Sequence, residues 1–253
     1  MIAGHSDFSV SIAAVSFAAA TKRYGSVTAV DNLDLTLQPG ELFGFLGPNG
    51  AGKTTAMKMA AGLVKPTSGT VLIAGYDIQD HPLEAKRLFG FVPDSPYIYE
   101  SLTGREYLHF SAGLYKLDHS YTKRRVAELT DMFGIGDMID KRAGEYSHGM
   151  KQRLVTASAF LHDPKIIIID EPMVGLDPNA VRKLKVILKD YCRNGGTVFF
   201  STHTLSDAEE LCDRIGIIHR GRLITCGRLV EMNEVYGSLE DMFIAATSQS
   251  GVL

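Results

Sequence analysis

Several features that would tie this chain to a particular compartment or partner are scarce. It has three cysteines in 253 residues, at positions 192, 212 and 226, and no C-x-x-C pair. Separated cysteines of this kind are typical of reduced thiols rather than of a disulfide framework. The net charge is −3, so no basic field indicates nucleic acid as a partner, and we expect none.

Long hydrophobic runs are also missing. No stretch approaches the roughly 20 apolar residues that a membrane-spanning helix needs. The small apolar segment 11–20 is interrupted by serines, and Lys22 and Arg23 follow it rather than precede it. This order argues against a signal peptide and against an anchor. We therefore expect any membrane role to come through a partner.

The most informative stretch that the chain does contain is a phosphate-loop pattern. Residues 47–55 fit G-x-x-x-x-G-K-[ST], between an apolar strand at 41–46 and a helix at 53–63. Glycines let backbone N–H groups approach a phosphate, and the helix N-terminus attracts negative charge. Lys53 can reach the outer phosphates and the Thr54 hydroxyl can bind Mg²⁺. The predicted phosphate-binding residues are Gly47, Pro48, Asn49, Gly50, Ala51, Gly52, Lys53, Thr54 and Thr55.

The order of strand and helix patterns predicts an α/β fold with a mostly parallel sheet. Helical patterns dominate from 96 to 160, including a capping-box spacing at 103–106, so this part resembles a helical lobe inserted between strands. The run Lys165–Asp170 is nearly all isoleucine, as in a strand buried on both faces. The other predicted strands are 15–17 onward, 29–37, 70–74, 89–92, 197–201 and 215–218; the other predicted helices begin at 82, 121, 177, 204 and 238.

Two carboxylates follow the isoleucine strand directly. The carboxyl ends of parallel strands meet at one edge, so Asp170 and Glu171 should lie beside the phosphate loop. We expect Asp170 to hold Mg²⁺, through water, and Glu171 to act as general base on the attacking water. His203 follows the strand that ends at 201, at the same edge, and is predicted to contact the γ-phosphate.

The order and spacing of these motifs resemble the ATP-binding cassette (ABC) ATPases, from about Val15 to Ala245. The resemblance implies a P-loop ATPase core, RecA-like and with an antiparallel β subdomain, at 15–95 and 160–235. It also implies a helical lobe at 96–160 and a C-terminal tail at 236–253, all in one ABC ATPase domain. Residues 47–55 match the family's Walker A motif and 166–171 its Walker B motif with the catalytic glutamate. Residues 175–178, with Asp177, resemble the D-loop; His203 resembles the switch histidine, and Tyr24 the aromatic residue that stacks on adenine.

The segment 146–152 resembles the family's signature motif, Leu-Ser-Gly-Gly-Gln, with three departures. It keeps Ser147 and Gly149, which in the family contact the γ-phosphate bound by a second subunit. The resemblance therefore implies a head-to-tail pair, formed with a second copy or with a sister ATPase subunit. This version of the motif looks like that of bacterial type-2 exporter ATPases, which include drug, polysaccharide and peptide export systems.

Two features around the strand 89–92 leave alternatives open. The family has Gln where this chain has Asp94. A carboxylate there could approach Mg²⁺ or water but cannot donate as an amide does; alternatively, Asp94 is an ordinary loop residue. The segment 96–99, Pro-Tyr-Ile-Tyr, falls where the family docks a membrane partner, and packing of the lobe on the core is the alternative.

The leading hypothesis is an ATP-binding and ATP-hydrolysing subunit that powers a membrane transporter, with export favoured over import. It would lie at the cytoplasmic face of the membrane, peripheral, through an integral membrane permease subunit. A soluble ABC ATPase without a transport role is the main alternative. A regulatory module that does not hydrolyse ATP is a further alternative, and the presence of Glu171 and His203 argues against it. A small GTPase is another, and the absence of an Asn-Lys-x-Asp motif argues against that one. The sequence does not identify the cargo.

Overall fold

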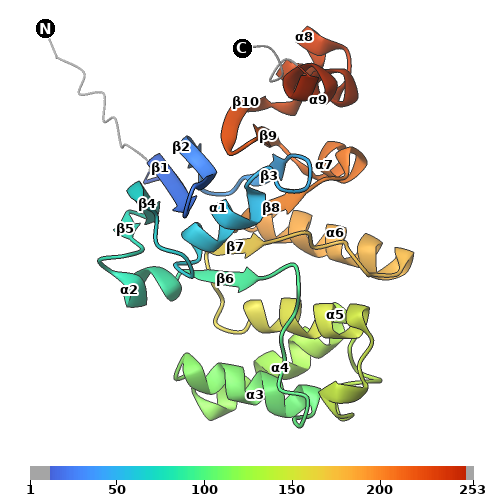
Figure 1. Ribbon diagram of the computed structural model, residues 1–253. Helices are drawn as coiled ribbons and strands as arrows, with labels where there is room; N and C mark the ends of the chain where they lie inside the picture. Colours follow the sequence, from blue (N-terminus) through green and yellow to red (C-terminus); the bar gives the residue numbers. More distant parts are fainter. Residues whose placement is uncertain (1–11, 249–253) are drawn as a thin grey trace, which may run out of the picture.

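The structure is a computed structural model that describes residues 12–248. Of the expected C-terminal tail at 236–253, positions 249–253 therefore lie outside the described residues. Figure 1 shows two sheets in the upper part of the molecule and a group of helices below β6. The strand order is β2-β1-β4-β5 in the smaller sheet and β10-β9-β3-β8-β7-β6 in the larger one. The phosphate loop joins the larger sheet to α1, so this sheet sets the position of the site.

The larger sheet is parallel except at one edge. Its strands β9, β3, β8, β7 and β6 pair in parallel, and β10 pairs antiparallel with β9. In β7, Ile166 and Ile168 belong to one buried cluster and Ile167 and Ile169 to another. Alternate side chains thus enter two cores, as the isoleucine run predicted. The strands are β3 Leu42–Leu46, β6 Phe89–Val92, β7 Ile166–Ile169, β8 Thr197–Thr202, β9 Arg214–His219 and β10 Arg222–Arg228.

The smaller sheet is antiparallel, which confirms the predicted β subdomain. Its inner face packs against α1 and the larger sheet in one hydrophobic cluster. Phe17 contacts Phe199 edge to face across this boundary, with 6.2 Å between ring centroids. Its strands are β1 Val15–Tyr24, β2 Val27–Leu37, β4 Ser68–Ile73 and β5 Tyr76–Asp77.

The helical lobe is inserted between β6 and β7. Its helices are α3 Gly104–Leu114, α4 His119–Phe133 and α5 His148–Ala159, with a 3₁₀ turn, η1, at Ala143–Glu145. The predicted capping box is present: the Thr103 side chain accepts from the N–H of Glu106, and the Glu106 carboxylate accepts from the N–H of Thr103 at 2.8 Å. Together with the two sheets, this lobe confirms the predicted fold class.

The C-terminal part is more ordered than a tail. It contains α8 and α9, which bury Leu229, Met232, Leu239 and Met242 against β9 and α7. The sequence analysis predicted neither α8 nor β10, and the domain boundary at 235 stays a prediction. The remaining helices are α1 Lys53–Ala60, α2 Pro82–Lys86, α6 Pro178–Arg193, α7 Leu205–Leu211, α8 Leu229–Tyr236 and α9 Leu239–Ser248.

The capping box gives a direct test of the lobe. Replacing Thr103 with alanine removes the side-chain acceptor at the start of α3 and should cost about 1 kcal/mol of folding free energy. For a domain of this size the melting temperature should fall by about 2–4 °C. Thr103→Ser keeps the hydroxyl and should melt close to the wild type. Equal melting temperatures for the alanine variant and the wild type would contradict the cap.

Candidate functional site

The phosphate loop lies between the end of β3 and the start of α1 and encloses a cavity of about 220 Å³. Gly52 has φ 113°, and a Cβ there would lie 2.5 Å from the carbonyl oxygen of Ala29, so the turn requires glycine. The N-cap of α1 is this same glycine, which offers no side-chain acceptor to the first-turn N–H groups. The cavity is lined by Ala29, Pro48, Asn49, Gly50, Ala51, Gly52, Lys53, Thr54, Thr55, Asp94 and Glu171.

The Lys53 ammonium lies inside this loop and is only 5% exposed. Its Nζ donates to the carbonyl oxygens of Gly47 at 2.7 Å and Pro48 at 3.3 Å. It also forms an ion pair with Glu171 Oε1 at 3.4 Å. A buried charge needs such partners. The predicted contact of Lys53 with the outer phosphates stays a prediction, and this position inside the loop is compatible with it.

Asp170 stands at the end of β7 and is 1% exposed. Its Oδ1 accepts from the Ser201 hydroxyl, and its Oδ2 has no hydrogen-bond partner among the residues that the structure describes. Burial raises the pKa of this carboxyl; the hydroxyls of Ser201 and Thr54 act against the rise, and the charges of Asp94 and Glu171 add to it. A buried carboxylate oxygen without a donor is suited to a cation.

These residues fit Mg²⁺. The described residues contain no group of three or more His, Cys, Asp or Glu that could cage a metal by themselves. Mg²⁺ does not require such a cage, because it is usually bound by one or two carboxylates together with substrate phosphates and water. Asp170 and the Thr54 hydroxyl supply oxygen donors beside the loop, and their binding of Mg²⁺ stays a prediction.

Glu171 and His203, the two predicted catalytic residues, are in contact. The Nδ1 of His203 lies 2.9 Å from Oε2 of Glu171, while Oε1 of the same carboxylate faces Lys53. The Glu171 side chain is 15% exposed and that of His203 48% exposed. The carboxylate is thus held from two sides at the mouth of the loop cavity.

Asp94 also belongs to this site. It lines the phosphate-loop cavity, and its carboxylate accepts from the N–H of Ser95 at 2.8 Å. It lies close enough to Asp170 to raise the pKa of that carboxyl. The metal-site hypothesis for Asp94 requires this proximity, whereas the ordinary-loop alternative does not predict it.

Four predicted residues lie elsewhere in the same chain. Tyr24 does not line the cavity; it is 48% exposed, and Lys22 Nζ lies 5.0 Å from its ring centroid. Ser147 caps α5 by accepting from the N–H of Met150 at 3.3 Å. Asp177 caps α6, and the N–H groups of Ala180 and Asn179 lower the pKa of its carboxyl.

Gly149 packs closely against the segment that contains Asp177. A Cβ on Gly149 would lie 2.7 Å from the carbonyl oxygen of Gly175. The ring of His148 lies against the Cα of Gly175, whose φ is 76°. The signature segment and the D-loop segment therefore form one packed unit, outside the phosphate-loop cavity.

Two residues of the site were not predicted. Ala29, in β2, forms one wall of the loop cavity, and Ser201 bonds to both Asp170 and Glu171. The signal for Ser201 was its place one strand away from Asp170 at the same sheet edge. The sequence analysis used the end of the strand at 197–201 only to place His203.

Comparisons with known proteins agree with this arrangement. The family described as ABC transporter matches residues 30–174, more than half of the chain. The chain belongs to the ABC transporter family. It is 40% identical over 208 residues to an uncharacterized ABC transporter ATP-binding protein of Nostoc, covering 81% of this chain and 62% of that protein. It is also 40% identical over 205 residues to the bacitracin transport ATP-binding protein BcrA of Bacillus licheniformis, covering 81% and 66%.

Solved structures show the same fold. An ATP-binding subunit of an ABC transporter is similar with a TM-score of 0.86 and 32% identity, over 92% of this chain and 98% of that one. The dimeric ATP-binding cassette MJ0796, bound to ADP and Pi, is similar with a TM-score of 0.77 and 26% identity, over 85% and 98%. The predicted recognition as an ABC ATPase subunit is confirmed, and so is the predicted enzyme class.

The buried carboxylate of this ABC ATPase should reduce its stability. The pKa of Asp170 is raised in the folded chain, so its charged form is disfavoured at neutral pH and this cost fades as the pH falls through the raised pKa. Asp170→Asn should therefore raise the melting temperature by about 2–4 °C near pH 7.5, with a smaller gain near pH 5. Calorimetry at both pH values measures this, and the exposed Asp80→Asn is the charge-matched control. A lower melting temperature for Asp170→Asn near pH 7.5 would contradict the burial argument.

Proposed function

We propose that this chain binds ATP with Mg²⁺ and hydrolyses it as the energy-supplying subunit of a membrane exporter. The observation that supports this best is the pair of carboxylates at the end of β7, one buried with a free oxygen and the next held between Lys53 and His203. A phosphate-loop cavity lies directly beside them. ATP hydrolysis needs this combination of a phosphate cradle, a metal-holding carboxylate and a group that orients water.

Each residue has a chemical role in this proposal. The loop N–H groups at 47–55 and Lys53 would bind the phosphates, while Thr54 and Asp170, with Asp94 nearby, would hold Mg²⁺. When bound, the metal supplies charge neutralisation at the phosphates. Glu171 accepts the proton of the attacking water, and His203, hydrogen-bonded to Glu171, contacts the γ-phosphate.

The proposal includes a second chain. Ser147 and Gly149 lie at the N-terminus of α5, which attracts anions, yet they are not among the residues that line the loop cavity of their own chain. A second copy or a sister subunit would present them to the ATP, with Asp177 beside them. The similar cassette MJ0796 is dimeric. Tyr24, exposed at the end of β1, is proposed to stack on adenine once ATP is bound.

A permease partner is proposed from the surface of the helical lobe. Between 12 and 248 no helix is long and apolar enough to cross a bilayer. A cavity of about 410 Å³ lies along 96–101 beside Lys151, and Tyr97 is 78% exposed. Tyr97 and Tyr99 pack edge to face on each other, and Tyr99 packs in the same way on Phe110.

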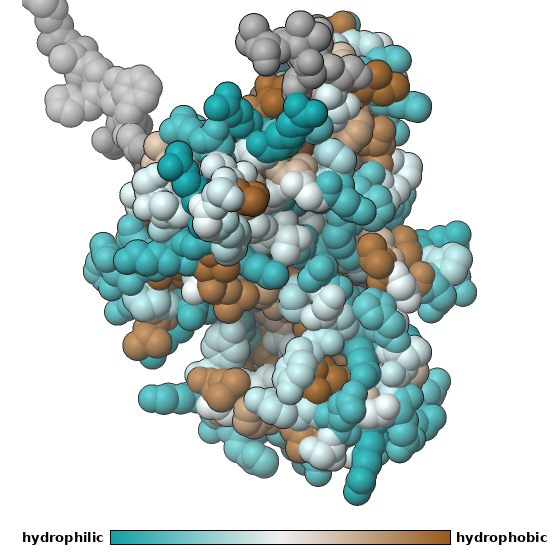
Figure 2. Space-filling view, in the orientation of Figure 1, coloured by the Kyte–Doolittle hydropathy of each residue, from teal (hydrophilic) through white to brown (hydrophobic). Residues whose placement is uncertain are grey.

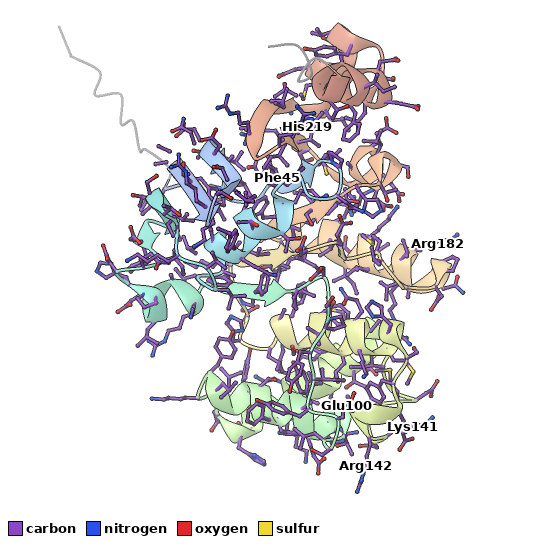
Figure 3. All side chains as sticks on the ribbon, viewed as in Figure 1. Phe45, Glu100, Lys141, Arg142, Arg182 and His219 are labelled. Carbon is purple, nitrogen blue, oxygen red and sulfur yellow. The ribbon has the colours of Figure 1, made fainter. Side chains whose placement is uncertain are left out.

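The rest of that face is mixed in character. Figure 2 shows hydrophobic side chains dispersed among hydrophilic ones on the face in view. Figure 3 places Glu100 on the helical lobe, far from His219 beside the larger sheet, and its carboxylate pairs with Lys151 at 3.0 Å. An aromatic groove with a charged rim suits a helix of a membrane subunit. This partner would hold the chain at the cytoplasmic face of the membrane.

The names of the relatives support export. Besides the bacitracin transport protein, a linearmycin resistance ATP-binding protein, LnrL of Bacillus subtilis, is 38% identical over 211 residues, covering 83% of this chain and 68% of that protein. A transport ATPase can confer drug resistance by driving the drug out of the cell, whereas import would not protect it, so these names favour an exporter over an importer.

Lys53→Ala should abolish ATP turnover, because it removes the only ammonium in the residues that line the loop cavity. Steady-state phosphate release by the purified chain measures this, with an expected fall of at least about 100-fold. Lys58→Ala, on the same helix and outside the cavity, is the matched control and should retain turnover. Turnover at the wild-type rate in Lys53→Ala would contradict the phosphate-loop assignment.

Glu171→Gln should trap an ATP-bound dimer, because the amide keeps the shape of the carboxylate but cannot accept the proton of water. Size-exclusion chromatography with light scattering, at saturating ATP and Mg²⁺, should show twice the monomer mass. The exposed Glu209→Gln, which loses the same charge on α7, should not accumulate the dimer. A monomeric Glu171→Gln chain under these conditions would refute either the dimer or the choice of base.

The transport proposal is tested by purifying this chain from its native cell in mild detergent. We expect an integral membrane protein to co-purify in comparable amount. Replacing Tyr97 with glutamate should release that protein while leaving ATP-driven dimerisation intact. Soluble partners alone, with the chain absent from the membrane fraction, would instead support an ABC ATPase without a transport role.

A further inference from the structure

Ser201 is the residue of the site to which neither the motifs nor the comparisons assign a role. It lies near the end of β8, which pairs in parallel with β7; Ile169 is opposite Phe200, so Ser201 comes level with Asp170. Its exposed fraction is 0%, so its hydroxyl must find partners within the protein.

Both partners of this hydroxyl belong to the carboxylate pair. Ser201 Oγ donates its single hydrogen to Asp170 Oδ1 and accepts from the backbone N–H of Glu171 at 3.0 Å. A serine hydroxyl has one donor and two acceptor positions, so these two bonds fix its rotation. One buried side chain thus bonds to two consecutive residues of the neighbouring strand end.

The bond to Asp170 determines which carboxylate oxygen is free. With Oδ1 held by Ser201, Oδ2 is the oxygen left without a hydrogen-bond partner among the described residues. Thr54, which lines the phosphate-loop cavity, also interacts with the Asp170 carboxylate through its hydroxyl. Ser201 therefore fixes the carboxylate so that one oxygen remains for a cation.

The bond to Glu171 acts on the backbone. Glu171 has φ 49°, a left-handed conformation that residues with a Cβ adopt only at a cost. The hydrogen bond from its N–H to Ser201 helps to offset that cost and holds the turn that follows β7. In this turn the Glu171 side chain meets Lys53 and His203.

We propose that Ser201 is a positioning residue that orients both carboxylates: it leaves one oxygen of Asp170 free for the metal, and it holds the backbone of Glu171 so that the Glu171 carboxylate faces the attacking water. This inference rests on the proposed function, in which Asp170 holds Mg²⁺ and Glu171 is the base. Ser201 is not among the residues that line the phosphate-loop cavity, so in this proposal it acts through these two residues.

The test compares Ser201→Ala with the wild-type chain in two measurements. The first is kcat for ATP, which should fall about 10–100-fold, as is typical when a hydrogen-bond partner of a metal-holding group is removed. The second is calorimetric affinity for the non-hydrolysable analogue AMP-PNP with and without Mg²⁺. In the wild type, Mg²⁺ should raise the affinity for AMP-PNP. In Ser201→Ala this gain in affinity should shrink by a factor similar to the fall in kcat, whereas the affinity measured without Mg²⁺ should stay within about twofold of the wild-type value.

A matched control removes another buried hydroxyl from the same strand. Thr197 is 2% exposed, and its hydroxyl accepts from Gly40 N–H at 2.9 Å at the other end of β8. Thr197→Val should lower the melting temperature without changing kcat or the effect of Mg²⁺. Ser201→Thr keeps a hydroxyl at this position, so it should retain part of the wild-type kcat and part of the effect of Mg²⁺ on AMP-PNP affinity. If Ser201→Ala does not fold, Ser201→Cys, a weak donor of similar volume, replaces it with the same expectations.

The outcomes separate this inference from the proposed function. If wild-type chain hydrolyses ATP and Ser201→Ala keeps both kcat and the Mg²⁺-dependent affinity within twofold, the positioning role is wrong and the proposed function stands. If the wild-type chain neither turns over ATP nor binds AMP-PNP more tightly with Mg²⁺, the proposed function itself is wrong.

Discussion

The burial of one carboxylate at the end of β7 is the constraint on which the rest of the site depends. Asp170 is almost fully enclosed, and burial raises the pKa of its carboxyl. A chain selected only for stability would replace it by a neutral residue. Its presence is understandable if a cation and phosphates complete its coordination when ATP binds. The free energy of unfolding is then lower without nucleotide, and the increase in this free energy when ATP and Mg²⁺ bind is correspondingly larger.

The fold places the other groups of the site beside Asp170, in positions that the sheet determines. Because β3, β7 and β8 are neighbours in one parallel sheet, the phosphate loop, the carboxylate pair and His203 all leave the same edge. These three strands are buried along their whole length, so packing on both faces fixes where their ends lie. In the proposed function, a second chain would instead pack against the unit formed by the start of α5 and the segment before α6, whose parts contact each other within one chain.

Much of this could be predicted because the signals are local. The loop pattern, the isoleucine strand and the capping box at Thr103 each lie within a few consecutive residues, and their chemistry does not depend on distant parts of the chain. The placement of Asp94 at the cavity was anticipated only as one of two alternatives, because a loop residue has no periodicity that fixes its direction.

The parts that were not predicted depend on long-range packing. In β10 the register shifts between Leu223 and Thr225, and the strand is half-buried at an edge, so no regular alternation marks it. Helix α8 is short, and its buried residues Leu229 and Met232 belong to a cluster that residues of β9 and α9 complete. The role of Ser201 depends on the pairing of β8 with β7, 31 residues apart in sequence at the contact with Asp170.

The most direct test of the central claim is an experimental structure of the wild-type chain with AMP-PNP and Mg²⁺. The account predicts the terminal phosphate within hydrogen-bond distance of Lys53 in one chain and of Ser147 in a second chain, with the metal beside Thr54 and Asp170. A nucleotide bound by a single chain, or bound outside the cavity formed by residues 47–55, would contradict it.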